Sequence, residues 1–413
     1  MAGTMRERSP GRWELRAYAG RDPLTGKPRQ VTRTYVADRR EKGAGKRQAE
    51  RELARLVAEV EQGQHGGSKA TLGQLLDDWT AHGERMGRSP KTLYEYRRKV
   101  DRQIRPALGA KPLDKLTAHD LDLFYANQLA AGLSDRSVLH LHRILTAALR
   151  QGRKWGWVTR SVAEDATPPK PVQAHLNPPP PDRVSALVGE AGRPAARNPE
   201  LATVITLAAL TGMRRGELCG LQWGDVDWQA STVTVRRAIW QAGGTVGVKP
   251  PKTHQVRELR LGAHAMGVLA GRAERATVDA TMAGITLRPT AFVFSPEVDG
   301  SRPMRPDSVT QAFDRLCRRM EDAEVAKLRK RDPLATLDDL PSSARWPYRF
   351  HDLRHYTATE LIAGGMDPRT VADRLGHADP SITLRVYAAG TPARAQAAAD
   401  ILEAGLLAVG PAD

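Results

Sequence analysis

The chain has 413 residues, which suits two or three domains, and its 40% of hydrophobic residues is enough for ordinary cores. It carries 63 Lys and Arg against 47 Asp and Glu, and the resulting net charge of +16 indicates a phosphate-rich partner such as nucleic acid. We see no long apolar run, signal peptide or lipidation motif, which argues against a membrane partner and predicts a cytoplasmic protein. Cys219 and Cys317 lie far apart in sequence, and we expect two reduced, partly buried thiols.

The first predicted unit consists of strands followed by a helix. Polar and apolar residues alternate through residues 11–36 on either side of the turn-forming segment 22–27, which predicts two strands joined by a turn. From Lys46 the apolar residues take up helical spacing, at Ala49, Leu53, Leu56 and Val60. Exposed arginines on the strands favour DNA binding over a solubilising or dimerising role.

Residues 71–163 have the pattern of an all-helical unit. Four helix starts are marked by the capping residues Thr71, Ser89, Thr117 and Ser134. Basic residues recur on these helices, at Arg97, Arg98, Lys99, Arg102, Arg143, Arg150, Arg153 and Lys154. Because they recur on successive helices, a surface that follows a phosphate backbone is favoured over a merely solvated face.

The proline-rich segment 165–182 separates this unit from the rest of the chain. Its prolines cannot donate backbone hydrogen bonds, which predicts an extended and stiff linker. Such a joint would let two domains close around a duplex, although a mere tether fits the same residues.

The carboxy-terminal part begins with a helix that starts near Asn198 and runs into the segment Thr211 to Leu218, TGMRRGEL. Residues 232–237 and 256–261 alternate as strands, and Gly243-Gly244 predicts a turn between them.

Three further segments follow this predicted hairpin. Residues 292–294 are expected to form a short buried strand and residues 308–320 an amphipathic helix. Residues 321–348 are interpreted as a surface insertion without an assigned role.

The segment from Phe350 to Tyr387 predicts three short helices that gather polar side chains. Phe350, Leu353, Thr357 and Leu361 have helical spacing, while His351, Arg354 and His355 lie on another side of the same turns. Gly364-Gly365 ends this helix, Asp367-Pro368 starts a second one, and Gly376 ends that. A third segment, opened by Asp379-Pro380, ends at Tyr387.

This pattern, His351-x-x-Arg354 followed by Leu375-Gly376-His377 and Tyr387, resembles the catalytic end of the tyrosine recombinase (phage integrase) family. The main departures from the family pattern are the insertion at 321–348 and an alanine-rich tail.

Two further family motifs are found upstream. The family's first arginine lies in a TG-x-R-x-x-E-L motif, which matches Arg214, and Glu217 matches its supporting acidic residue. The family's lysine lies on a β-hairpin and matches Lys252, with Lys249 as the less favoured neighbour.

The resemblance implies an α+β multidomain protein with the DNA-breaking-rejoining fold. It implies an arm-type DNA-binding domain of strands and a helix at 1–66, and an all-helical core-binding domain at 70–164. The linker at 165–182 leads to a mainly helical catalytic domain with a small β-sheet at 183–413.

A phosphodiester carries a negative charge that must be neutralised before a nucleophile can attack it. In the chemistry that the resemblance implies, Arg214 and Arg354 bind the non-bridging oxygens, because a guanidinium stays charged and can bind phosphate through two N–H groups. His377 adds a hydrogen bond to the same oxygens.

The remaining roles concern the nucleophile and the protons. Tyr387 attacks the phosphate and forms a 3′-phosphotyrosyl link, whose bond energy allows rejoining without ATP. His351 manages the proton of the tyrosine, and Lys252 supplies a proton to the departing 5′ oxygen. No metal and no cofactor are required.

The implied function is site-specific recombination, which integrates or excises a mobile element. The expected partners are double-stranded DNA with core-type and arm-type attachment sites, three further copies of the chain in a DNA-bound homotetramer, and, as candidates, a directionality factor and a host DNA-bending protein. Such a protein would act in the bacterial cytoplasm, associated with the nucleoid.

Three alternatives remain open at this stage. His351 and His355 have the i, i+4 spacing of zinc ligands, with His377 available as a third, which would suit a metal-dependent hydrolase. A DNA-binding regulator could retain the fold without catalysis. A type IB topoisomerase would share the tyrosine chemistry.

Overall fold

The computed structural model describes residues 3–21, 28–37, 45–61, 70–172, 178–193, 198–251 and 256–376. The chain divides into two compact units, residues 1–173 and 174–413. Within the described ranges, no helix is both long and apolar enough to span a membrane.

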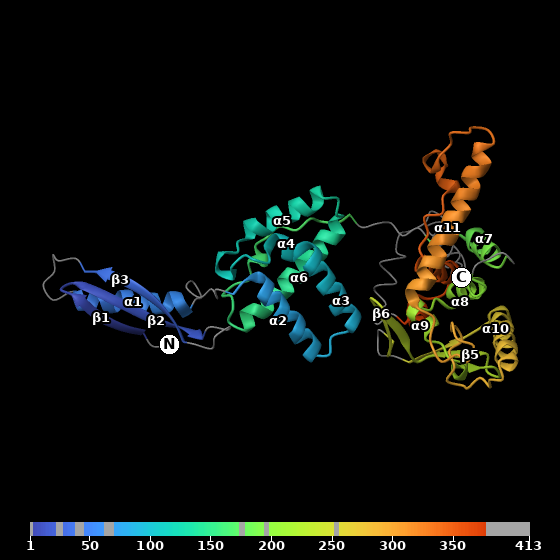
Figure 1. Cartoon of the computed structure of the whole chain (residues 1–413), viewed down its shortest axis with the longest axis horizontal. Coiled ribbons are helices and arrows are strands. Elements are labelled where there is room, and N and C mark those ends of the chain that lie inside the picture. Colours follow the sequence, from blue (N-terminus) through green and yellow to red (C-terminus); the bar gives the residue numbers. More distant parts are fainter. Residues whose placement is uncertain are drawn as a thin grey trace, which may run out of the picture. The chain divides into compact units, whose positions relative to one another are not determined.

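The amino-terminal part of the first unit is a three-stranded antiparallel sheet with one helix on it (Figure 1). The sheet contains β1 (Gly3–Ser9), β2 (Arg12–Arg21) and β3 (Pro28–Val36), and α1 (Gly45–Glu61) packs against it. Leu15 and Ala17 of β2 meet Ala49 and Leu56 of α1 in a small core. Strands β2 and β3 and the helix confirm the expected elements. The edge strand β1 adds to them, because its largely polar sequence gives no alternating apolar signal.

The remainder of the first unit is helical. It contains α2 (Leu72–Arg85), α3 (Pro90–Lys99), α4 (Arg105–Leu108), α5 (Ala118–Ala130) and α6 (Asp135–Lys154). A π-helical segment, Val100–Ile104, joins α3 to α4, and short 3-10 turns lie at Leu113–Lys115 and Val162–Glu164. Thr71 and Thr117 form capping boxes, and Ser134 accepts a bond from the Ser137 N–H, as expected. Ser89 occupies the N-cap of α3 but forms no capping bond through its side chain.

The second unit is built around the buried helix α8 (Leu201–Thr211), which packs against α7 (Pro181–Ala191), α10 (Ala263–Met282) and α12 (Asp352–Ala363). Short helices α9 (Arg215–Cys219) and α13 (Pro368–Leu375) flank it. Cys219 and Cys317 are free and fully buried, and burial raises the pKa of each thiol to about 12.

Two small antiparallel sheets accompany these helices. The strands β4 (Val226–Asp227), β5 (Thr232–Val235) and β8 (Arg257–Arg260) form one sheet, and β6 (Ala238–Ala242) and β7 (Thr245–Lys249) form the other. The turn at Gly243-Gly244 therefore joins β6 to β7, and the two strands predicted on either side of it pair with each other as β5 and β8.

The prediction of a short buried strand at residues 292–294 is wrong about the strand but correct about the burial. Phe292 makes only an isolated bridge to Gln222, although Phe292 and Phe294 are both buried as predicted. A short turn at Trp223–Asp225 follows Gln222 and presents Asp225 to Arg237.

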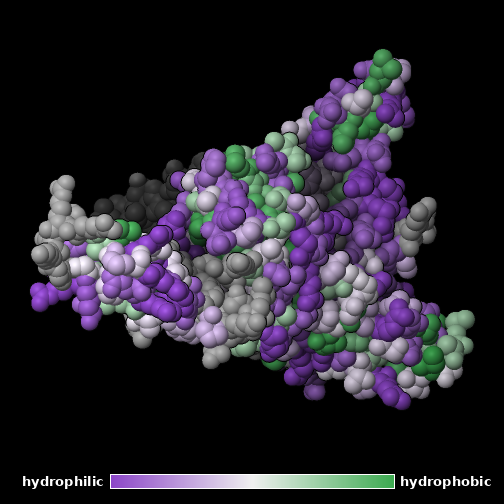
Figure 2. Space-filling model, turned by 60° about the vertical axis from the view of Figure 1, so that its left-hand side comes forward, coloured by the Kyte–Doolittle hydropathy of each residue, from purple (hydrophilic) through white to green (hydrophobic). Residues whose placement is uncertain are grey.

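Helix α11 (Pro306–Arg329) is longer than predicted, because the first part of the supposed insertion continues it. The chain returns along α11 through turns at Leu337–Asp339 and Ser342–Ala344. Val325 of α11 is buried, and so are Ala335 and Leu340 of the returning segment. Figure 2 shows this extension as a mainly hydrophilic projection with an apolar patch at its tip. Leu334 and Leu337, in the segment that follows α11, are exposed.

Candidate active site

Arg214 lies at the turn between α8 and α9. Gly212 ends α8 with φ of +66°, a conformation that favours glycine, and a β-carbon there would overlap the side chain of Leu375. The Arg214 guanidinium donates from Nη1 to Glu217 Oε1 at 2.9 Å and from Nη2 to the carbonyl oxygen of Gly376 at 2.8 Å. Arg214 therefore joins the end of α8 to the end of α13.

The carboxylate of Glu217 is 1% exposed and is shared by two arginines. Arg257 of β8 donates from Nη2 to Oε2 at 2.6 Å and from Nη1 to Oε1 at 3.3 Å. Burial opposes ionisation of Glu217, but Arg257 first and then Arg214 outweigh it, and the pKa lies below the ordinary value. Glu217 is thus charged at neutral pH.

Helix α12 brings Arg354 to the same place. Arg354 is 4% exposed, and its guanidinium donates from Nη1 to the carbonyl oxygen of Gly212 at 2.7 Å. Thr357, one turn further along α12, donates to the carbonyl oxygen of Ala209 at 2.8 Å and fixes α12 against α8. Arg214 and Arg354, 140 positions apart in sequence, therefore meet where α8 ends.

His351 is the N-cap residue of α12, and its ring lies 5.1 Å from that of His355, centroid to centroid, edge to face. Although His351 is exposed, partial burial of its ring, together with His355 and Arg354, lowers its pKa to about 4. Burial likewise lowers the pKa of His355. Both imidazoles are therefore neutral at physiological pH, and a neutral imidazole can accept a proton.

Helix α13 has the caps that the sequence predicts. The Asp367 carboxylate accepts bonds from the N–H groups of Arg369 and Thr370, and Gly376 ends the helix with φ of +66°. Arg374 donates from Nη2 to the carbonyl oxygen of Leu210 at 3.0 Å, which ties α13 to α8.

Three of the six expected catalytic residues lie outside the described residues: Lys252, His377 and Tyr387. Lys252 directly follows Pro251, and His377 directly follows Gly376, which accepts the bond from Arg214. The structure brings together the other three, Arg214, His351 and Arg354. Lys249, the less favoured lysine, ends β7 opposite Ala238.

Arg257 and Arg374 belong to the site, but motif reasoning did not identify them. Arg257 stands five positions after Lys252 on a strand predicted by alternation, and that closeness is the one signal that could have drawn attention to it. Arg374 stands in the last turn of a predicted helix, where a basic residue is ordinary.

The metal-site alternative depends on a third ligand beside His351 and His355. Across the described ranges, no group of three or more His, Cys, Asp or Glu side chains is arranged to hold a metal ion. The acidic neighbour Asp352 is engaged elsewhere, because it accepts bonds from the backbone and guanidinium of Arg349.

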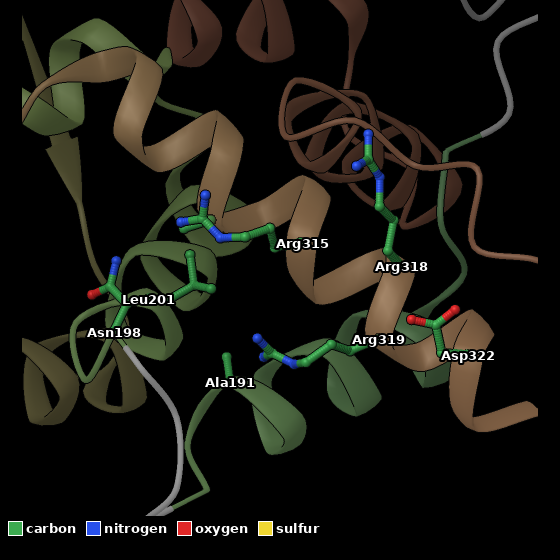
Figure 3. Close-up of a pocket in the computed structure, with 8 residues that line it drawn as sticks. Ala191, Asn198, Leu201, Arg315, Arg318, Arg319 and Asp322 are labelled. Carbon is green, nitrogen blue, oxygen red and sulfur yellow. The ribbon is translucent and has the colours of Figure 1, made fainter. Parts of the chain in front are cut away.

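A cavity of about 360 Å³ lies between α7, α8 and α11, at the opposite end of α8 from Gly212. Figure 3 shows the side chains of Arg315 and Arg319 directed into it. It is lined by Ala191, Asn198, Leu201, Ala312, Arg315, Arg318, Arg319 and Asp322, and it is separate from the site at Arg214.

Comparison with known proteins identifies a family for most of the chain. The model of the phage integrase family matches residues 181–394, and the N-terminal SAM-like domain of phage integrases matches residues 71–129. An integrase of Streptomyces ambofaciens is 26% identical over 386 residues, which cover 91% of this chain and 89% of that protein.

Two solved structures share the fold. The Tn1549 transposon integrase in complex with transposon right end DNA has a TM-score of 0.62 at 21% identity, covering 81% of this chain and 99% of that one. A lambda integrase tetramer bound to a Holliday junction has a TM-score of 0.52 at 18% identity, covering 92% and 94%.

Proposed function

Because this chain belongs to the phage integrase family and is a tyrosine-type site-specific DNA recombinase, we propose that Tyr387 cleaves DNA by attacking a phosphate held by Arg214 and Arg354. The products are a 3′-phosphotyrosyl link and a free 5′ hydroxyl. A second DNA end reverses the attack, and the mobile element is integrated or excised.

The observation that carries this proposal is the meeting of Arg214 and Arg354 where α8 ends. Among the described contacts, Arg214 donates to the carboxylate of Glu217 and to the carbonyl oxygen of Gly376, and Arg354 donates to the carbonyl oxygen of Gly212. Glu217 is also neutralised by Arg257, and the carbonyl oxygens carry no net charge. Three guanidinium groups, those of Arg214, Arg257 and Arg354, thus lie where α8 ends, beside one buried carboxylate, and guanidinium groups suit the binding of a phosphate.

The proton transfers need groups with suitable pKa values. The pKa of His351 is lowered to about 4, so its imidazole is neutral at neutral pH and has a nitrogen free of protons that can accept the proton of Tyr387. Lys252 supplies the proton for the 5′ oxygen, and His377 donates to a non-bridging oxygen. In sequence, Lys252 stands five positions before Arg257 of β8, and His377 directly follows Gly376.

The DNA partner follows from the family and from the charge of +16. On this double-stranded DNA, the helical and catalytic domains bind a core-type attachment site, and residues 1–66 bind an arm-type site. Exchange of four strands needs four nucleophiles, which favours a homotetramer, the state of lambda integrase on its Holliday junction. The protein then acts at the nucleoid, in the bacterial cytoplasm.

The decisive experiment replaces the nucleophile. Tyr387→Phe removes only a hydroxyl, and we expect this variant to bind core-site DNA normally but to form no covalent complex on a nicked suicide substrate. The rate should fall below detection, because phenylalanine has no hydroxyl with which to form the phosphotyrosyl bond. The complex is measured by its altered mobility on a denaturing gel.

Tyr356→Phe is the matched control. Tyr356 lies on α12, packs against the core, and is held in a helix that does not bring it to the phosphate. This variant should form the covalent complex at the wild-type rate, and EDTA should leave the wild type active. Cleavage by Tyr387→Phe, or loss of cleavage in EDTA, would contradict the mechanism.

A further inference from the structure

Arg257 occupies the centre of the arginine cluster without belonging to the expected catalytic set. Its guanidinium donates two bonds to Glu217, from Nη1 and Nη2, and its Nε donates to the carbonyl oxygen of Arg374 at 3.1 Å. The side chain is 9% exposed. A β-carbon at Gly376 would lie 2.9 Å from its Nη1, which shows how closely the end of α13 passes over it.

These contacts join three segments that each lead to an expected catalytic residue. Arg257 itself stands on β8, which follows Lys252 after a few residues. Glu217 binds Arg214, and the carbonyl of Arg374 is three residues before His377. One side chain therefore connects all three segments.

Arg257 also supplies a counter-charge to Glu217. Glu217 is buried and ionised, and without Arg257 its counter-charge among the described contacts would be Arg214. A guanidinium that is the only counter-charge of a buried carboxylate attracts a phosphate more weakly, because the carboxylate cancels most of its positive potential. With Arg257 present, Glu217 is already neutralised and still orients Arg214.

We propose that Arg257 is a positioning residue for strand cleavage, which neutralises Glu217 so that the charge of Arg214 acts on the scissile phosphate and which anchors the end of α13 ahead of His377. The inference rests on the proposed function, since it assigns Arg257 to the site in which Arg214 binds phosphate.

The test compares two substrates under single-turnover conditions with the full chain and saturating core-site DNA. One is the nicked suicide substrate, and the other carries a methylphosphonate at the scissile position, where a neutral methyl replaces a charged oxygen. Arg257→Met should slow cleavage of the phosphate on the order of 100-fold. The ratio of the wild-type rate to the Arg257→Met rate should be at least tenfold smaller on the methylphosphonate, because that group carries little negative charge for Arg214 to neutralise.

Two further variants separate positioning from folding. Arg260→Met changes an exposed side chain of the same strand and should cleave at the wild-type rate. Adding Glu217→Gln to Arg257→Met removes the unpaired buried charge but keeps an oxygen to accept the Arg214 bond, and it should recover at least tenfold in rate. If Arg257→Met does not fold, Arg257→Gln takes its place in the comparison of substrates, because it also removes the charge but can still donate a hydrogen bond to Glu217.

The outcomes are distinguishable. Cleavage by Arg257→Met within threefold of wild type, an equal defect on both substrates, or no recovery in the double variant would each overturn the positioning role. If the wild type forms no covalent complex through Tyr387, the proposed function fails instead, whatever the variants do.

Discussion

At the scale of single residues, the site depends on hydrogen bonds between arginine side chains and the carbonyl oxygens where helices end. Helix α8 ends at Gly212 and α13 at Gly376, and each carbonyl accepts a bond from an arginine of another segment. The end of a helix carries partial negative charge, which stabilises a nearby cation. The same bonds therefore complete the helix ends and fix the guanidinium groups.

Gly212 is required by this arrangement, and Gly212→Ala is expected to destabilise the protein. The left-handed φ and the overlap with Leu375 together should lower the free energy of unfolding by roughly 1–3 kcal/mol. Gly189→Ala is the control, since Gly189 lies in α7 with open space at its β-carbon, and it should be neutral or slightly stabilising. Urea denaturation measures both, and equal midpoints would contradict the expectation.

The depressed pKa of His351 predicts a pH dependence with a definite sign. In the unfolded chain the imidazole titrates near 6.5, and in the folded protein near pH 4. The unfolded state therefore takes up a proton first as the pH falls, and this contribution to stability, complete above pH 6.5, is lost between about pH 6.5 and 4.

An NMR titration of the free protein measures this pKa directly, with His351→Gln to assign the resonance. We expect a midpoint well below 6. The stability of His351→Gln should also fall less steeply than that of the wild type over the same pH interval. A midpoint near 6.5 would refute the environment described for His351.

At the scale of elements, the amino-terminal sheet offers a polar face opposite α1. Alternation along β2 directs Glu14 and Arg16 away from the core residues Leu15 and Ala17, and Glu14 pairs with Arg8 and Arg16. The Arg8 interaction lowers the pKa of Glu14. This face is where we expect the arm-type contacts.

Removing this element should separate two kinds of DNA binding. A protein that begins at Ser68 lacks the sheet and α1, and we expect it to bind an isolated core site with wild-type affinity. On long attachment DNA it should lose on the order of tenfold or more in affinity, because one of two linked binding modules is gone. Gel-shift titrations on the two DNAs provide the measurement, and equal binding and recombination on the long DNA would refute the arm-domain assignment.

At the scale of the whole molecule, the proposed tetramer requires contacts between copies of the chain. The tail after Pro392 lies outside the described residues, and its sequence has apolar residues at helical spacing, Ala395, Ala398, Ile401, Leu402 and Leu406. Such a stripe needs a partner, and we propose that it docks on a neighbouring copy.

Deleting residues 393–413 tests this assembly. We expect synapsis of two core sites to fall at least tenfold, while binding to a single duplex changes less than threefold, because the proposed docking joins copies of the chain. Sedimentation of the protein with one and with two duplexes would show the difference. Normal synapsis by the shortened protein would rule the docking out.

The sequence by itself determined the local features of this protein and its family. TGMRRGEL at 211–218 and His351-x-x-Arg354 identified the family before any contact was known, and the family match confirms it. The helix starts at Thr71, Thr117 and Asp367 were also predictable, because an N-capping bond joins residues only a few positions apart.

Only the tertiary structure decided the pairings between distant segments. The bond between Arg257 and Glu217 spans 40 positions and that between Arg214 and Gly376 spans 162, and neither leaves a periodic signal in the sequence. The pairing of β5 with β8 and of β6 with β7 could not be predicted either, since alternation marks a strand but does not select its neighbour. The physical reason is that capping and periodicity are local, whereas the neutralisation of Glu217 depends on which segments the packing of α8 brings together.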